Sequence, residues 1–341
     1  MTWNILYCSD NNYAPYLGVS IRSLLENNKD AENITFYVVS DNISEDNTDR
    51  LKKQVAAYGE GRRLIIIDGR QWVERLVELK LLPYRGGLTT NLRLFFMEYI
   101  EEDVERLLYL DCDTIICGSL RELFNMPVED APAAVIIDSL SGNEYKKLIG
   151  FKSTDVYFNA GVILFDVENW KKYDCQNKLS QFMCDPKYKL PNNDQDFLNI
   201  LLKDNKKIIS PKYNFQTTHQ IYCEDVYFSV YPDTAYYSNG EIDEARNAPV
   251  ILHAYRFLGQ FPWHKNAIHP WKELFWKNVE ASEWSDLRPR ENVGKLFAIE
   301  RFGFKVLPKK LFLSIFKRYQ TYSFSKRLKL MRKMNGGESK K

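Results

Sequence analysis

The chain has 341 residues, of which 45% are hydrophobic and 27% charged, and a formal net charge of +2. This composition excludes a largely disordered chain, a collagen-like chain and a coiled coil, and the length suits one large domain or two modest ones. No apolar run is long enough for a membrane-spanning helix, the N-terminus lacks the basic start of a signal peptide, and six cysteines without a Cys-x-x-Cys pair fit a reducing cytosol.

Short apolar runs alternate with amphipathic stretches along the first two-thirds of the chain. The predicted strands are Trp3–Cys8, Ile34–Val39, Leu64–Ile67, Arg106–Leu110, Ala133–Ile137 and Gly161–Val167. The predicted helices among them are Tyr13–Leu25, Ser44–Tyr58, Trp72–Leu79 and Thr90–Ile100. Strands separated by helices predict an α/β fold with a parallel or mixed sheet and helices on both faces.

The later part of the chain has a weaker pattern. Residues 205–250 are rich in Tyr and Asn and are interpreted as a loop-heavy insertion, and Val279–Pro289 is interpreted as the end of the main body. In α/β sheets, ligands bind at the carboxyl ends of the strands. Polar residues directly after predicted strands are therefore the first candidates for a functional site.

Asp111 and Asp113 follow the apolar strand Arg106–Leu110 and form the sharpest candidate pair. Two carboxylates at this spacing can hold one hard cation, which in turn binds a diphosphate that the carboxylates alone would repel. The triplet Asp-x-Asp occurs twice in the chain and by itself is equally compatible with a turn capped by carboxylates. Its position after an apolar strand favours the cation site.

His253 follows the strand-like run 249–252 and could complete that site. Two carboxylates and an imidazole suit Mn²⁺ or Mg²⁺, and the nitrogen ligand favours Mn²⁺. A lone histidine is more often a structural residue, and that is the interpretation given to His219, His264 and His269.

A second polar cluster, residues 192–196, opens an apolar helical run, and its acids are ordinary helix-capping residues when taken alone. The chain contains no P-loop, no Gly-x-Gly-x-x-Gly after the first strand and no Gly-x-Ser-x-Gly elbow. Any phosphate would therefore be bound by a metal or by side chains.

Six segments taken in order resemble glycosyltransferase family 8. This family consists of retaining enzymes and includes bacterial galactosyl- and glucosyltransferases of lipopolysaccharide and capsule assembly and, more distantly, glycogenin. The resemblance covers about residues 3–280. Its segments are Asp10–Tyr16, Thr89–Leu94, Leu108–Asp113, Tyr157–Val162, Asp194–Asn199 and His253–His264.

The resemblance implies a GT-A fold, which is one nucleotide-sugar-binding α/β domain with a mixed central sheet, together with a UDP-sugar donor and a divalent metal, usually Mn²⁺. It implies that Asp111, Asp113 and His253 hold the metal, and that Asp194 and Gln195 are the catalytic residues beside the anomeric carbon. Retention would proceed through a covalent intermediate or by front-face attack, and both stay open. The residues implied to bind the donor are Asp10, Asn12, Tyr13, Arg93, Asp111, Cys112, Asp138, Asn159, Ala160 and Gly161.

One segment departs from the family pattern. The family has a lysine that grips the diphosphate just before a Pro-Trp pair, whereas here Phe261 precedes that pair. Arg256 and Lys265 are the nearby cations that could replace the lysine.

Residues 301–341 carry 13 Lys and Arg against one acid, a net charge of +12, while the preceding 300 residues have a net charge of −10. In Lys309–Thr321, Leu311, Phe312, Ile315, Phe316 and Tyr319 share one predicted helical face. A basic amphipathic helix is typical of binding to an anionic membrane surface. A helix packed on the body is the alternative, and the acidic body argues against a nucleic-acid partner.

We therefore expect residues 1–285 to form a GT-A glycosyltransferase domain and residues 286–341 to form a basic, aromatic-rich tail that associates with a membrane. The expected function is metal-dependent retaining transfer of galactose or glucose from a UDP-sugar to a glycan or lipid-linked acceptor in cell-surface polysaccharide synthesis. The expected location is the cytoplasm, peripheral at the inner face of the cell membrane. A sugar-nucleotide nucleotidyltransferase and a non-enzymatic glycan-binding or membrane scaffold are the alternatives.

Overall fold

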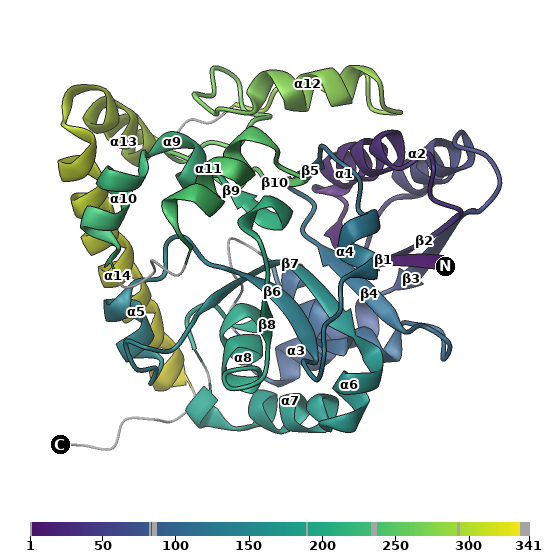
Figure 1. Cartoon of the computed structure of the whole chain (residues 1–341), viewed down its shortest axis with the longest axis horizontal. Helices are drawn as coiled ribbons and strands as arrows, with labels where there is room; N and C mark the ends of the chain where they lie inside the picture. The colour runs from purple at the N-terminus through teal and green to yellow at the C-terminus, as the bar shows by residue number, and fades with distance from the viewer. Residues whose placement is uncertain are drawn as a thin grey trace.

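The structure, a computed structural model, describes residues 2–81, 83, 87–188, 190–232, 237–291 and 294–334. A mixed seven-stranded sheet crosses the centre of the molecule and carries helices on both faces (Figure 1). β1 is parallel to β2 and β4, whereas β7 is antiparallel to β4 and β6. In spatial order the strands are β3 (Arg62–Asp68), β2 (Asn33–Asp41), β1 (Thr2–Asp10), β4 (Arg106–Leu110), β7 (Phe158–Asp166), β6 (Ala133–Ile137) and β8 (Lys207–Ile208).

Helices cover the sheet on both sides. The apolar cluster on one side contains residues of α1 (Ala14–Asn27), α2 (Glu45–Ala56), α4 (Arg121–Asn125), α11 (Asn239–Asn247) and α12 (Lys272–Glu280), and α12 joins it by packing on α1. The other face packs against α3 (Arg70–Glu78), the 3₁₀ helix Thr89–Glu98, α6 (Val167–Lys172), α7 (Cys175–Cys184) and α8 (Asp194–Leu201).

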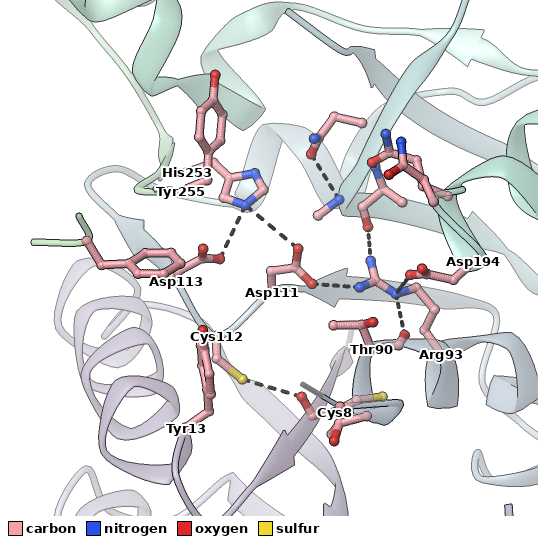
Figure 2. A pocket seen from close by; sticks show the side chains of 18 of the residues that line it. Cys8, Tyr13, Thr90, Arg93, Asp111, Cys112, Asp113, Asp194, His253 and Tyr255 are labelled. Carbon is pink, nitrogen blue, oxygen red and sulfur yellow. Dashed lines mark hydrogen bonds and ion pairs between the residues drawn. The ribbon is translucent and has the colours of Figure 1, made fainter. Parts of the chain in front are cut away.

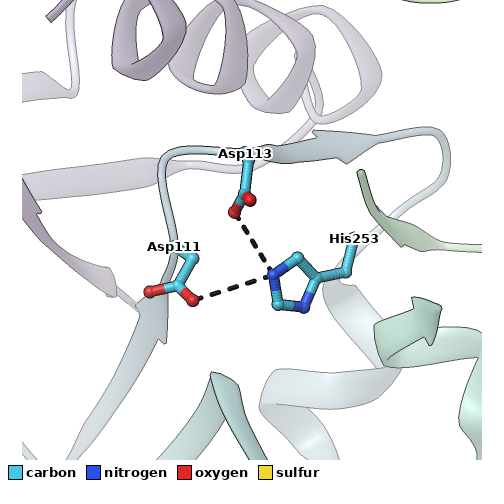
Figure 3. Close-up of side chains that lie close together, drawn as sticks. All are labelled: Asp111, Asp113 and His253. Carbon is cyan, nitrogen blue, oxygen red and sulfur yellow. Dashed lines mark ion pairs between the residues drawn. The ribbon is translucent and has the colours of Figure 1, made fainter. Parts of the chain in front are cut away.

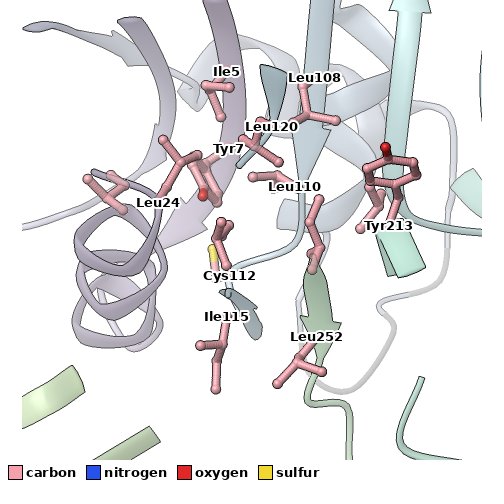
Figure 4. Close-up of a cluster of buried hydrophobic side chains, with 14 of the residues drawn as sticks. Ile5, Tyr7, Leu24, Leu108, Leu110, Cys112, Ile115, Leu120, Tyr213 and Leu252 are labelled. Atoms are coloured by element: carbon pink, nitrogen blue, oxygen red, sulfur yellow. The ribbon is translucent and has the colours of Figure 1, made fainter. Parts of the chain in front are cut away.

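The side chains of the central strand β1 show why both faces of this sheet need a layer of helices. Ile5, Leu6 and Tyr7 are all fully buried, and successive side chains point to opposite faces. Ile5 and Tyr7 pack in the cluster with Leu24 of α1 (Figure 4), whereas Leu6 belongs to the cluster on the other face. Burying such a side chain stabilises the fold by about 1.5–3 kcal/mol. A continuous apolar run is therefore the expected sequence for this strand.

A small second sheet extends the core beyond the end of β4. It contains β5 (Thr114–Ile116), β10 (Ile251–His253) and β9 (Phe215–Gln216), with β10 in the middle. β10 runs antiparallel to β5, and its register pairs His253 with Thr114. Because β5 follows β4 after a three-residue turn, this register carries His253 to the carboxyl end of β4.

The predicted strands and the first three predicted helices are confirmed, as is the mixed sheet. The segment Thr90–Ile100 is a 3₁₀ helix with a kink at Phe95 instead of a regular α-helix. The interpretation of residues 205–250 as loop-heavy is wrong, because the described residues there form α9 (Thr217–Ile221), α10 (Glu224–Val230) and α11. These helices have five, seven and nine residues, which is less than three turns each and too little for a clear helical period.

The C-terminal helices α13 (Lys295–Val306) and α14 (Lys309–Met334) lie on the side of the molecule opposite α1 and α2 (Figure 1). α14 packs against α10 and α5 (Asn143–Leu148). Its residues Leu313 and Met331 are almost fully buried. The helix is therefore attached to the body along one face.

The residues of the predicted apolar face of Lys309–Thr321 differ in how far they are buried. Phe312 is buried against the body, whereas Leu311, Ile315 and Tyr319 are about half exposed. The division of the chain at residues 285 and 286 into a catalytic domain and a membrane tail stays a prediction.

Residues on both sides of that division are anchored on α1 and α2. Trp284 is 3% exposed, and its indole Nε1 donates a hydrogen bond to Asn47 Oδ1 at 2.9 Å. A Cβ at Gly18 of α1 would lie 2.0 Å from Trp284 Cζ3, so only glycine leaves room for the indole. Arg50 of α2 pairs with Asp286, with Nη1 2.6 Å from Oδ1.

We predict that Trp284→Ala lowers the free energy of unfolding by about 3–5 kcal/mol, because it leaves a large cavity over α1. Urea unfolding followed by circular dichroism measures the change. The control is Val77→Ala, at a position that is 60% exposed, which should shift stability by less than about 0.5 kcal/mol. Equal small effects of both substitutions would show that the indole does not hold this segment.

Candidate active site

The structure brings all the predicted site residues to one cavity of about 640 Å³ (Figure 2). The cavity lies at the carboxyl ends of β1 and β4, where α/β sheets bind ligands. The predicted residues that line it are Asp10, Asn12, Tyr13, Arg93, Asp111, Cys112, Asp113, Asp138, Asn159, Ala160, Gly161, Asp194, Gln195 and His253.

Asp111, Asp113 and His253 form a possible metal-binding cluster (Figure 3), with one ligand atom of each within 4.8 Å of the others. His253 Nε2 lies 3.2 Å from Asp113 Oδ1 and 3.7 Å from Asp111 Oδ2. The backbone fixes both acids, because Asp111 N–H donates to the Gly161 carbonyl and the Asp113 carbonyl accepts from Ala254 N–H, each at 2.8 Å. Neighbouring strands therefore hold the cluster in place.

A chain of buried amides orients the His253 ring. The Gly161 backbone N–H donates to Asn159 Oδ1 at 3.0 Å, which identifies that atom as the oxygen. Asn214 Nδ2 donates to the same oxygen at 2.9 Å, so Asn214 Oδ1 faces His253 Nδ1 at 3.0 Å. Nδ1 must therefore carry the proton, and the Nε2 lone pair points toward the two carboxylates. Asn159 Nδ2 donates in turn to Asp138 Oδ2 at 3.0 Å.

These residues suit a divalent cation. An imidazole that presents Nε2 while Nδ1–H is hydrogen-bonded is the usual form of a metal-binding histidine. The space at the cluster depends on Gly161, because a Cβ there would lie 2.2 Å from His253 Cε1 and 2.8 Å from Asp111 Oδ2. Two carboxylate oxygens and one nitrogen are compatible with Mn²⁺ or Mg²⁺.

Arg93 connects the metal-binding cluster to Asp194, the carboxylate that is predicted to be catalytic. Its side chain is 3% exposed, and its guanidinium forms ion pairs of 2.9 Å with Asp111 Oδ1 and Asp194 Oδ2 (Figure 2). Further N–H groups donate to the carbonyl oxygens of Thr90 and Ala160. Its ion pairs and hydrogen bonds are thus with residues that line the cavity, while the guanidinium carbon lies 4.1 Å from the centre of the Tyr109 ring.

Burial and charge act in opposite directions on the ionisable groups. Burial disfavours charged His253, but Asp113 and Asp111 outweigh it and raise the pKa of the imidazole. Burial raises the pKa of Asp194 despite the opposing Arg93 guanidinium. Burial also raises the pKa of the Cys112 thiol, so this cysteine is a neutral lining residue and not a nucleophile.

Asp194 and Gln195 begin α8 next to the cavity. The preceding residue Asn193 has φ 41°, a left-handed conformation that is costly for a residue other than glycine. Gln195 Oε1 accepts the Ala160 N–H at 3.0 Å, and its Nε2 donates to Tyr157 at 3.2 Å. The Asp194 carboxylate pairs with Arg93, so it has an ionic role that the capping interpretation did not include.

The cations proposed to replace the family lysine lie elsewhere. Neither Arg256 nor Lys265 is among the described residues that line the cavity, and Lys265 pairs with Glu291 at 2.8 Å. Phe261 does line it and stacks on Trp263 with a ring separation of 4.4 Å. The cavity instead receives Arg290, whose Nη2 donates to the Asn12 carbonyl at 3.1 Å.

Several residues of this region were not predicted from the sequence, among them Asn214, Arg290, Gln320 and Phe324. No local pattern marks Asn214 or Arg290, since each acts on a residue far away in the chain. Gln320 and Phe324 belong to α14 and line the cavity. Burial lowers the pKa of both His219 and His269 to about 4, and neither these two nor His264 is among the described residues that line the cavity, so their structural role stays a prediction.

Known proteins resemble this chain over most of its length. The model of glycosyl transferase family 8 matches residues 4–267. The chain belongs to this family. It is 27% identical over 321 residues to a lipopolysaccharide 1,2-glucosyltransferase of Escherichia coli, covering 92% of this chain and 89% of that protein. It is also 27% identical over 292 residues to a lipopolysaccharide 1,3-galactosyltransferase of Salmonella typhimurium, covering 83% of this chain and 79% of that protein.

Solved structures also resemble this chain. The galactosyltransferase LgtC, in complex with donor and acceptor sugar analogues, superposes with a TM-score of 0.65 and 25% identity, covering 83% of this chain and 96% of that one. The GT-A fold and a retaining glycosyltransferase activity are thereby confirmed. The nucleotidyltransferase and the non-enzymatic scaffold are set aside.

Within the described residues, no helix combines the length and the apolar character needed to cross a membrane.

We predict that Asn214→Leu weakens Mn²⁺ binding by about 10- to 100-fold, because His253 loses the acceptor that fixes its tautomer. Isothermal titration calorimetry with Mn²⁺ measures the affinity, and the melting temperature reports the folded state. The control is Asn177→Leu, which replaces an exposed amide on α7. Unchanged Mn²⁺ affinity in a folded Asn214→Leu protein would contradict the role of this residue.

Proposed function

We propose that the chain transfers galactose or glucose from a UDP-sugar to a glycan or lipid-linked acceptor in cell-surface polysaccharide synthesis, and that it requires Mn²⁺ or Mg²⁺. The observation that carries the metal requirement is the charge of the cavity. Its described lining contains five aspartates and two arginines, a net charge of −3 with His253 neutral. A diphosphate would be repelled by this surface unless a cation lay between them.

The metal would be held by Asp111, Asp113 and His253. A divalent cation there stabilises the negative charge that develops on the departing diphosphate. The chain's own contribution is the geometry of the three ligands, fixed by Gly161, Ala254 and the Asn214 hydrogen bond. The nitrogen ligand supports Mn²⁺ over Mg²⁺.

The nucleoside would lie toward the start of α1. Asp10 Oδ1 accepts the Tyr13 N–H at 2.8 Å, which holds the Tyr13 ring at the cavity edge for stacking on the base. Asn12 and Cys112 line the same end. Arg290 is held there by the Asn12 carbonyl and would supply the positive charge that the missing lysine supplies in the family.

The donor sugar would lie between Asp138 and Asp194. Asp138 and Asn159 are mutually hydrogen-bonded and would bind sugar hydroxyls. Neither catalytic candidate is a free nucleophile, because Asp194 is paired with Arg93 and Gln195 Oε1 already accepts a backbone N–H. This supports front-face attack, with Asp194 orienting hydroxyls and Gln195 placed by Ala160.

The metal requirement is directly testable. We predict that Asp113→Asn lowers hydrolysis of UDP-galactose or UDP-glucose by about 100-fold or more, because the cation loses a charged ligand. The chelator EDTA should abolish hydrolysis by the unchanged protein, and added Mn²⁺ should restore it. Asp130→Asn changes an exposed carboxylate and is the control. Full activity of Asp113→Asn in chelator would refute the proposal.

We further propose that the enzyme works at the cytoplasmic face of the cell membrane and contacts anionic lipid through the outer faces of α13 and α14. The exposed apolar side chains there include Phe302, Tyr319 and Tyr322, which are 67%, 55% and 67% exposed. α14 and the second half of α13 belong to residues 301–341, which have a net charge of +12. Each base near an anionic surface contributes about 1 kcal/mol before screening.

Co-sedimentation with phosphatidylglycerol vesicles tests this surface. The unchanged protein should bind, and binding should weaken with salt because screening acts over about 10 Å at 0.1 M. The triple variant Phe302→Ser, Tyr319→Ser and Tyr322→Ser should bind less and still hydrolyse the donor. Phosphatidylcholine vesicles are the control. Binding that is equal for both proteins, or insensitive to salt, would argue against this membrane face.

A further inference from the structure

The active-site cavity has one wall from the C-terminal helix. Gln320 and Phe324 of α14 line the same cavity as Asp138, Asp194 and Gln195. In Figure 1, α14 lies on the opposite side of the molecule from α1, whose start carries Tyr13. Tyr13 at the start of α1 and the α14 residues Gln320 and Phe324 thus come from distant parts of the fold to line one cavity.

Two basic side chains of α14 attach the helix to the body on either side of Gln320 and Phe324. Lys317 Nζ lies 3.1 Å from Glu144 Oε2 of α5 and donates to the Val230 carbonyl at 3.0 Å. Arg327 Nε donates to the carbonyl of Pro191 at 2.7 Å, in the loop that leads to Asp194. Gln320 and Phe324 lie between Lys317 and Arg327 in the chain. Neighbours in this series are three or four residues apart, so all four side chains share one face of the helix.

Phe324 is also tied to the catalytic residues by packing. Its ring centre lies 4.7 Å from that of Tyr145, whose hydroxyl donates to Asp196 at 2.8 Å. Asp196 also accepts the Tyr157 hydroxyl at 2.7 Å, and Tyr157 accepts from Gln195 Nε2 at 3.2 Å. This sequence of contacts holds the Phe324 ring at a fixed place relative to Gln195.

We propose that Gln320 and Phe324 form an acceptor subsite that binds a sugar ring of the glycan acceptor. The proposal rests on the proposed function, because it requires the nucleoside and donor sugar to occupy the rest of the cavity. An aromatic ring offers an apolar surface to the C–H face of a pyranose, and an amide can bind two hydroxyls. Within the described residues the Gln320 amide has no hydrogen-bond partner, so it is available to a ligand.

The opposite face of the same helix explains which acceptor would reach this subsite. Tyr319 and Tyr322 project outward beside Arg318 and Lys326, while Gln320 lines the cavity. A helix lying on a membrane by its outer face would place its inner face a helix diameter of about 10 Å from the lipid surface. The acceptor class that fits this arrangement is a glycolipid whose sugar extends from the membrane.

The test separates donor chemistry from acceptor binding. The probe is the glycolipid fraction extracted from source cells that lack this protein, presented in detergent micelles with radiolabelled UDP-galactose and UDP-glucose. In the variants Gln320→Ala and Phe324→Leu, donor hydrolysis in the absence of acceptor should fall by a smaller factor than transfer to the glycolipid. In transfer, they should raise the half-saturating glycolipid concentration by roughly tenfold, the scale of a lost binding contact.

Two further variants distinguish binding from structure. Phe324→Tyr keeps the ring and should restore near-normal half-saturation, whereas Phe324→Leu keeps only the packing on Tyr145. Ser323→Ala lies next to Phe324 but is exposed, and it should change neither readout. Melting temperatures compare the folded states.

The outcomes are distinct. Unchanged half-saturation in Gln320→Ala and Phe324→Leu would overturn the acceptor subsite while leaving the proposed function intact. Equal losses of hydrolysis and transfer would also overturn it, since α14 would then serve the donor site. Absence of hydrolysis or transfer by the unchanged protein would overturn the proposed function, and the acceptor subsite with it.

Discussion

The site is organised around one buried cation, the guanidinium of Arg93. It lies between Asp111 and Asp194 at 2.9 Å from each, on the ring of Tyr109, and it is 3% exposed. Removing one partner of such a buried pair leaves an uncompensated charge, which costs far more than an exposed ion pair contributes. The positions of the metal-binding carboxylate and of the carboxylate at the start of α8 are therefore linked. A shift of either one would strain both.

The sheet topology makes that link possible. β4 is parallel to β1 on one side and antiparallel to β7 on the other, so the end of β4 meets the start of β7. Asp111 thus lies beside Gly161, and the missing side chain of that glycine leaves space for the cluster. The small sheet then supplies His253 through the pairing of β10 with β5. Three separate strands contribute to the cluster, and each is fixed by backbone hydrogen bonds rather than by the flexible side chains.

The sequence was sufficient for six of the seven strands of the central sheet, for α1, α2 and α3, and for the polar residues that follow the strands. Asp111 and Asp113 could be found because a strand end is recognisable locally, and the ordered family segments identified their partners. Asn214 could not be found, because its function depends on atoms of His253 and Asn159 that are distant in the chain and become neighbours only in the fold. Arg290 is a similar case, since it contacts Asn12 from 278 residues away.

The C-terminal helix shows a different limit of sequence patterns. Hydrophobic periodicity indicates that a helix is amphipathic, but it does not say which face contacts the body when aromatic and basic residues occur on both. In α14 the side facing the body contains Lys317 and Arg327, whose charges are satisfied by Glu144 and by backbone carbonyls, while exposed tyrosines lie on the other side. Long basic side chains can lie along a packed surface and still place their charge on a polar partner. A helix with two such faces can belong to the wall of the cavity and to an outer surface at once. Some basic side chains of the tail, such as Lys317 and Arg327, attach the helix to the body, and others face solvent. The net charge of the tail does not distinguish these two groups of side chains.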